Sequence, residues 1–163
     1  MTSQILSEQV SAEPGLAAWI TFLRAHAAIT RELSARLEAE HGLTLSDYDV
    51  LVQLYHAEGH RMRRIDIARS VLLTASGITR LLDGLERCGL VERQRCESDL
   101  RVTYAALTKQ GVARVEEARC SHHADVDELF ASKFDAKEQA ALAELLGRLP
   151  LARTAAACES EHA

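Results

Sequence analysis

Apolar residues recur at helical spacing through the first third of the chain and predict two helices. The first helix is expected to begin at Pro14, because proline suits the first helical turn, and to end near Gly42. Its apolar positions are Leu16, Ile20, Leu23, Ala27, Leu33 and Leu37. The second helix is expected to begin at Ser46, a good N-cap, and to run to about Ala57. Asp49, three positions after this cap, is placed favourably for the helix dipole.

The middle of the chain has the pattern of two short helices joined by a turn. Ile65 to Leu72 is expected to form the first, although Ile65 stands where a Ser or Thr cap would be natural. Thr74 is expected to cap the second helix, and Gly89 to end it at the position that glycine commonly occupies after a helix. The helix that begins after Thr74 is expected to bury four apolar residues on one face: Ile78, Leu81, Leu82 and Leu85.

Two short strands with alternating polarity follow this helix and predict a β-hairpin. They span Val91 to Cys96 and Leu100 to Leu107, and the turn between them is formed by residues 97–99. Met62 and Arg63 are expected to form a short third strand that pairs with the hairpin.

The last third of the chain again predicts helices. Thr108 is expected to cap a long helix, and the pair Asp135 and Glu138 has the spacing of a capping box for a final helix. The long helix has an apolar stripe formed by Val112, Val115, Val126, Leu129 and Phe130. The final helix is expected to face inward through Ala140, Ala141, Leu142, Leu145, Leu146 and Leu149, and to end at Pro150. We expect residues 1–13 to be a disordered tail and residues 151–163 to be frayed.

Composition fits a single domain built on a hydrophobic core, with 47% hydrophobic and 26% charged residues in 163. No apolar run approaches the length of a membrane span, and the N-terminus lacks the features of a secretory signal, so we expect a cytoplasmic protein that does not bind membranes. The four cysteines have no spacing typical of a disulfide scaffold and are expected to be free thiols.

Charge is distributed unevenly along the chain. The whole carries a net −5, but the stretch from His60 to Arg114 contains eleven Lys or Arg and six Asp or Glu. A basic middle between acidic ends fits one DNA-binding face, although a chance fluctuation among solvated surfaces would look the same.

The polar face of the second short helix has the chemistry of a helix that reads DNA. It begins with small and hydroxylated side chains, including Ser76 and Thr79, and continues with Arg80. Hydroxyl groups can bind phosphates or base edges, and an arginine fork can bind guanine. Arg93, Arg95 and Arg101 make the adjacent hairpin basic.

These residues carry a family resemblance. The run SGITRLLDGLERCGLVER, followed by Asp99-Leu100-Arg101 and by LTKQG, closely resembles the winged helix-turn-helix of MarR-type transcription regulators. The resemblance implies a mainly α fold with a small β wing, in which residues 14–150 form one domain. Within it, about 43–111 would be the DNA-binding lobe, and residues 14–42 and 112–150 would be long dimerisation helices.

The resemblance also implies which residues contact duplex DNA. The recognition helix would enter the major groove, and the wing arginine, oriented by Asp99, would enter the adjacent minor groove. The candidate DNA-binding residues are Thr74, Ser76, Thr79, Arg80, Arg93, Arg95, Asp99 and Arg101. The alternative for the pair Asp99 and Arg101 is a surface salt bridge of little consequence. Two positions depart from the family pattern, Ala75 in the helix and Leu100 in the wing.

Family members usually respond to a small anionic or phenolic ligand held between the dimerisation helices and the DNA-binding lobe. Five residues fall on elements that border this region: Trp19, His26, Tyr48, Tyr55 and His56. The alternative for each aromatic residue is a place in the core.

The cysteines and histidines offer two further hypotheses. Cys96 lies among arginines that favour the thiolate, so oxidation there would alter the wing, whereas Cys88 is expected to be a core residue. Cys120, His122 and His123 do not form a ligand set with useful spacing, and we interpret the histidines as solvated. The sequence contains no motif of a catalytic site or cofactor site, so we expect neither an enzyme nor a bound cofactor or metal.

The sequence therefore predicts a homodimeric transcription regulator, expected to be a repressor, that binds a pseudo-palindromic operator and is released by a small ligand. Two alternatives remain open. One is a thiol-based redox-responsive regulator, and the other is a helical protein-interaction module with a vestigial DNA lobe.

Overall fold

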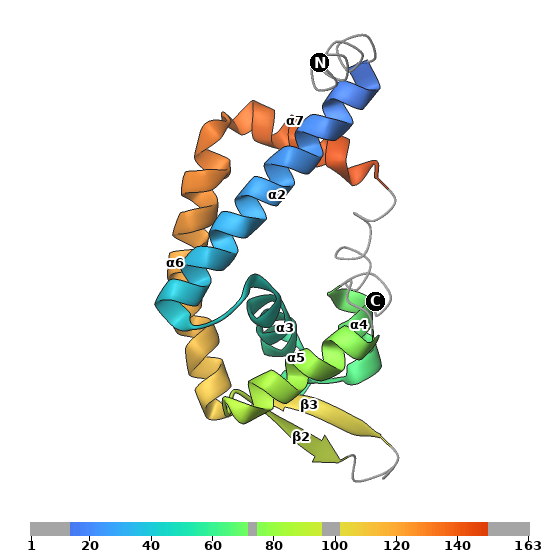
Figure 1. The fold of residues 1–163 in the computed structure, drawn as a ribbon, viewed down its shortest axis with the longest axis vertical. Helices are drawn as coiled ribbons and strands as arrows, with labels where there is room; N and C mark the ends of the chain where they lie inside the picture. Colours follow the sequence, from blue (N-terminus) through green and yellow to red (C-terminus); the bar gives the residue numbers. More distant parts are fainter. Residues whose placement is uncertain (1–13, 72–74, 96–101, 150–163) are drawn as a thin grey trace, which may run out of the picture.

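The protein has a lower lobe, from which a pair of long helical arms rises (Figure 1). The structure is a computed structural model that describes residues 14–71, 75–95 and 102–149. The arms are α2 (Pro14–His41), α6 (Lys109–Leu129) and α7 (Ala136–Gly147), with the short turn η2 (Ala131–Lys133) between the last two. The lobe contains α3 (Leu45–His56), η1 (Glu58–His60), β1 (Arg61–Arg63), α4 (Arg64–Ser70), α5 (Ala75–Arg87), β2 (Val91–Arg95) and β3 (Thr103–Leu107). This confirms the predicted helical fold with a small β wing.

The three strands form an antiparallel sheet in the order β1-β3-β2. The predicted pairing of Met62 and Arg63 with the hairpin is confirmed, and it extends to Arg61, which lies opposite Ala106. Among the described residues, β2 runs to Arg95, and β3 begins at Thr103, because Val102 is not in a strand. The turn that we assigned to residues 97–99 lies outside the described residues.

The hydrophobic core lies in the lobe and extends onto the adjoining part of α6. Its fully buried side chains come from α3, α4 and α5 and include Leu51, Leu54, Ile67 and Ile78, all with 0% of their surface exposed. Val115 of α6 packs in the same cluster. The predicted inward face of α5 is confirmed, because Ile78, Leu82 and Leu85 are all buried.

Most predicted helix ends are correct, and two helix starts are wrong. Asp135 and Glu138 form the capping box of α7. Gly89 adopts a left-handed conformation with φ +70°. Its amide donates to Glu86 O at 2.9 Å, while Leu90 N donates to Leu85 O at 3.0 Å, the pattern of a Schellman motif.

The first wrong prediction is the cap of α3, which is Thr44 and not Ser46. Thr44 Oγ1 accepts from Asp47 N at 3.2 Å, and Asp47 Oδ2 accepts from Thr44 N at 3.0 Å. The helix therefore begins two residues earlier than predicted. Similarly, α4 begins after Arg63, which makes no side-chain cap, so the weakly capped position is not Ile65.

Thr108 joins the wing to the arm. Its hydroxyl accepts from Gly111 N at 3.0 Å, as predicted for the cap of α6, and donates to Gly89 O at 2.7 Å. Gly111 is buried, and its α-carbon faces the carbonyl oxygen of Leu90 so closely that a Cβ there would overlap it. Thr108 and Gly111 thus hold the start of α6 against the residues that follow α5, Gly89 and Leu90.

The arms present an apolar surface that this chain does not cover. Trp19 and Leu145 are 54% and 55% exposed. The other large exposed apolar residues of the arms are Leu16, Phe22, Leu23, Phe130 and Leu149. The inward orientation predicted for α7 is therefore wrong within a single chain, where Leu142 and Leu146 are half-buried and the other predicted residues are exposed. None of the described helices is long and apolar enough to cross a membrane.

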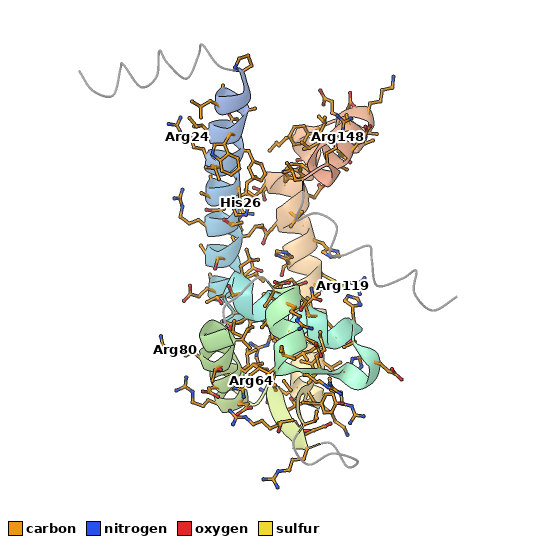
Figure 2. The ribbon with its side chains drawn as sticks, turned by 90° about the vertical axis from the view of Figure 1, so that its right-hand side faces the viewer. Arg24, His26, Arg64, Arg80, Arg119 and Arg148 are labelled. Carbon is orange, nitrogen blue, oxygen red and sulfur yellow. The ribbon has the colours of Figure 1, made fainter. Side chains whose placement is uncertain are left out.

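Ion pairs hold α2 against α6. Arg36 Nη1 lies 2.7 Å from Asp125 Oδ1 and 3.0 Å from Glu128 Oε2, and Arg36 Nε lies 3.1 Å from Glu32 Oε1. The hydrogen bonds from Arg36 lower the pKa of Glu128 and raise that of Arg36 itself. These contacts join the C-terminal part of α2 to the C-terminal end of α6, whereas the N-terminal end of α2 and α7 stand apart in Figure 2.

Candidate nucleic-acid interface

A groove of about 680 Å³ runs between α5 and the wing. Arginines line it from three different elements: Arg63 at the end of β1, Arg64 at the start of α4, and Arg93 and Arg95 on β2. Other polar groups in its wall are Thr79, Asp83, Glu86, Thr103 and Tyr104. This groove is the place where the sequence predicted a DNA-reading helix beside a basic hairpin.

The described part of α5 brings two predicted residues to this surface. Thr79 is half-buried, and its Oγ1 accepts a hydrogen bond from Arg64 Nη1 at 3.1 Å. Arg80 is exposed, and no ion pair holds it to any residue that the structure describes. Figure 2 shows Arg80 and Arg64 in the lower lobe, at the opposite end of the molecule from Arg24 and Arg148.

Arg93 has a different environment from the one that the sequence suggested. Its Nε donates to Glu86 Oε1 and its Nη2 to Asp83 Oδ1, both at 2.6 Å. The bond to Glu86 and the charges of both carboxylates raise the pKa of Arg93. Arg93 therefore ties the wing to α5 and neutralises two carboxylates that would otherwise repel a phosphate. Arg95 is exposed on the same strand.

Sequence reasoning missed the arginines that precede α4. Apart from a short strand at Met62 and Arg63, we predicted no role for this segment. In the structure, Arg61 and Arg63 lie over the ring of Tyr104, with guanidinium carbons 5.1 and 6.0 Å from the ring centroid. The signal was present in the sequence as Arg-x-Arg, because alternate residues of a strand face the same side.

Several predicted site residues fall where the structure gives no description. Thr74, Cys96, Asp99 and Arg101 lie outside the described residues, and Ser76 belongs to α5 but its side chain is not described. Their roles in DNA binding or redox sensing stay predictions.

The five candidate ligand residues occupy three separate places. Trp19 and His26 lie along one side of α2, each with its ring centroid 6.1 Å from that of Phe22. Tyr48 is buried, in agreement with the core alternative. The hydroxyl of Tyr55 donates to Glu116 at 3.2 Å, and its ring meets the exposed His56 edge-on. Since Trp19 is 54% exposed, the core alternative is wrong for it in the single chain.

His122 is not the solvated histidine that the sequence predicted. It is half-buried where α6 meets α3, with its ring centroid 4.7 Å from that of Tyr48. Its Nδ1 is buried and has no hydrogen-bond partner in the described structure. Burial lowers the pKa of His122, the charge of His123 lowers it further, and Asp125 opposes both.

The thiols and potential metal ligands add little to the site. Cys88 and Cys120 are both free and exposed, so the core assignment of Cys88 is wrong. No group of three or more potential ligands could hold a metal ion within residues 14–71, 75–95 and 102–149.

Comparison with known proteins identifies the class to which this fold and groove belong. The model of the MarR family matches residues 43–103. The HTH-type transcriptional regulator MhqR of Bacillus subtilis is 30% identical over 139 residues, which cover 85% of this chain and 93% of MhqR. The chain belongs to the MarR family of DNA-binding transcription regulators.

Two solved structures from Streptomyces coelicolor share the fold. AbsC, a MarR family transcriptional regulator, is 32% identical, with a TM-score of 0.75 over 80% of this chain and 87% of AbsC. Sco3205, a MarR family regulator solved in complex with DNA, is 25% identical, with a TM-score of 0.76 over 80% of this chain and 81% of Sco3205.

Proposed function

We propose that the chain binds a pseudo-palindromic operator as a homodimer, with α5 in the major groove and the wing in the adjacent minor groove. The observation that carries this proposal is the groove, which is lined by Thr79 and by arginines of three elements, with the exposed Arg80 next to Thr79 on α5. Arg80 supplies the forked donor that reads guanine, while Arg64 and Arg95 suit phosphates. Sco3205, which shares the fold, was solved in complex with DNA, and this supports DNA as the ligand of the chain.

The homodimer forms through the arms. Support comes from their exposed apolar side chains, of which Trp19, Phe22 and Leu145 are the largest or most exposed. So many large apolar side chains exposed on the arms are a usual mark of an interface. Two-fold symmetry then places the two α5 helices on successive major-groove faces, about 34 Å apart.

The regulator acts as a repressor, and a small anionic or phenolic ligand releases it from DNA. We place the ligand beside Tyr48 and His122, where α3 of the lobe meets α6 of the arm. The buried Nδ1 of His122 is a polar atom with no partner in the described structure, so a small conformational adjustment would offer it to a phenol or carboxylate. A ligand at this junction alters the angle between lobe and arm, and thereby the spacing of the two recognition helices.

The DNA-binding mode is tested by titrating a duplex that the protein itself has selected from a random library. We expect tight binding that weakens steeply with salt, and a loss of at least tenfold in affinity for Arg80→Ala combined with Arg101→Ala. Arg24→Ala is the matched control, because Arg24 is exposed at the far end of α2 (Figure 2). Unchanged affinity of the double variant, or a salt slope near zero, would reject the mode.

Repression and release are tested with a reporter placed behind the selected duplex. Expression of the chain should lower reporter output. Tyr48→Phe combined with His122→Phe should keep this repression and abolish the response to the phenolic or carboxylic compounds that relieve it. A response that survives in this variant would place the ligand elsewhere.

A further inference from the structure

The outer face of the wing sheet carries a stacked cluster of two arginines and one tyrosine. Arg61 and Arg63 alternate along β1, so both face the same side, and Tyr104 lies opposite Arg63 on the neighbouring β3. The guanidinium carbon of Arg61 lies 5.1 Å from the centroid of the Tyr104 ring, and that of Arg63 lies 6.0 Å from it. We call Arg61, Arg63 and Tyr104 the arginine–tyrosine face.

Stacking on a ring prepares a guanidinium for binding an anion. The ring contacts the flat face of the guanidinium, whereas its N–H donors lie in the plane and point outward from its edge. An arginine held in this way loses less side-chain entropy when it binds a phosphate than a mobile one. Arg61 is exposed, and no ion pair joins it to a carboxylate among the described residues.

The acidic residue on the same face lies apart from Arg61. Glu92 is opposite Ala106, which in turn is opposite Arg61, so β3 lies between the two residues and their backbones are roughly 9–10 Å apart. The carboxylate of Glu92 accepts a hydrogen bond from Gln94 Nε2 at 2.9 Å. Glu92 therefore forms no ion pair with Arg61.

The arginine–tyrosine face is continuous with the groove beside α5. Arg63 and Tyr104 line both surfaces, and Arg64 follows them into the groove, where it meets Thr79. Tyr104 is the second residue of β3, next to Thr103, which pairs with Arg95 at the end of β2. The ring of Tyr104 therefore lies near the end of the sheet at which the two hairpin strands are connected.

We propose that the arginine–tyrosine face is a second DNA-contacting surface, which binds the sugar-phosphate backbone beside the wing. This inference depends on the proposed function, because it requires α5 and the wing to be seated on a duplex. Its contacts are to phosphates, so they strengthen binding equally on all sequences, whereas Arg80 discriminates among them.

The test measures affinity as a function of salt for the wild type, Arg61→Ala, Tyr104→Leu and the control Arg24→Ala. Each protein is titrated with its selected duplex and with a scrambled duplex of the same composition. Losing one phosphate contact per subunit should reduce the slope of log affinity against log salt by about 0.9 per contact, so by about 1.8 in a homodimer. Arg61→Ala should weaken both duplexes by the same factor, and Arg80→Ala should weaken mainly the selected one.

Tyr104→Leu separates stacking from charge. It keeps both arginines, and we expect weaker binding to both duplexes because the guanidinium groups are no longer held. Ethylation interference on the selected duplex should show phosphates whose modification impairs the wild type and Arg24→Ala but no longer affects Arg61→Ala. Thermal midpoints equal to that of the wild type establish that the variants are folded.

The outcomes distinguish this inference from the proposed function. A wild type that binds no duplex would overturn both. A wild type that binds with a steep salt slope, while Arg61→Ala has the same slope and the same interference pattern, would overturn this inference alone. Equal affinities of Tyr104→Leu and the wild type would show that stacking contributes nothing and would also overturn it.

Discussion

Because α6 approaches the backbone of Leu90 closely at Gly111, we expect Gly111→Ala to destabilise the fold. A Cβ at this position would overlap the carbonyl oxygen of Leu90 and come within 3.0 Å of Leu107 Cδ2. The first of these atoms belongs to the backbone next to the buried Leu90, so it cannot swing away as the end of a long side chain could. Gly111→Ala must therefore push α6 away from the wing exit.

The expected cost of Gly111→Ala is about 3 kcal/mol, the upper part of the range for overpacking a well-filled core. For a chain of this length, that corresponds to a thermal midpoint lower by roughly 10 °C. Gly84→Ala is the matched control, since a Cβ there would meet only Arg87 Nη2 at 4.0 Å. In the interior of α5, this change should stabilise by about 0.5–1 kcal/mol, because alanine is the better helix former.

Circular dichroism melts and urea titrations at one fixed protein concentration measure both variants. The fixed concentration matters because a homodimer gains stability by mass action. Midpoints for Gly111→Ala within about 2 °C of the wild type would refute the packing described at Leu90. A Gly84→Ala variant as unstable as Gly111→Ala would show that the loss of stability does not come from the contact between residue 111 and the carbonyl oxygen of Leu90.

The other predictions concern the cap, the buried histidine, the wing and the arms. Thr44→Ala should cost about 1 kcal/mol and Ser46→Ala almost nothing in urea unfolding, because only the first accepts the capping hydrogen bond. The folded pKa of His122 lies below its unfolded value of about 6.5, so the wild type should lose stability as pH falls below about 6.5, and His122→Phe should lose less over the same range. Arg93→Met should weaken duplex binding, and neutralising its two carboxylate partners in the same protein should restore most of it; no restoration would mean that Arg93 binds DNA itself. Leu145→Glu should yield a monomer by analytical ultracentrifugation, and a dimer that persists would move the interface away from α7.

Local signals made most of the fold predictable. A cap such as Thr108, a capping box such as Asp135 with Glu138, and a terminating glycine such as Gly89 each act within a few residues, so a sequence records them directly. The apolar face of α5 could also be predicted, because Ile78, Leu82 and Leu85 recur at helical spacing. These signals, together with the family motifs, also located the groove.

The start of α3 shows where local signals are ambiguous. Thr44 and Ser46 are each followed three residues later by an aspartate, so both have the spacing of a capping box. Tertiary packing decides between them: Leu43 is 3% exposed, and a helix that begins at residue 45 places Tyr48 and Leu51 in the core.

Non-local contacts explain what the sequence left open in the site. The partners of Arg93 lie on α5, seven and ten residues away, and only the turn between helix and wing brings them together. His122 lies on a stretch of α6 that has many polar residues, and nothing in its own helix indicates that Tyr48 of α3 covers it.

The proposed regulator reads one duplex with two copies of this chain, each through its own groove. The affinity and stoichiometry of binding to a full palindrome and to a single half-site, measured in the same buffer, test this arrangement. We expect two chains on each palindrome and binding to the half-site that is weaker by several orders of magnitude, since a half-site engages one groove only. One chain per duplex, or equal affinity for the two duplexes, would contradict it.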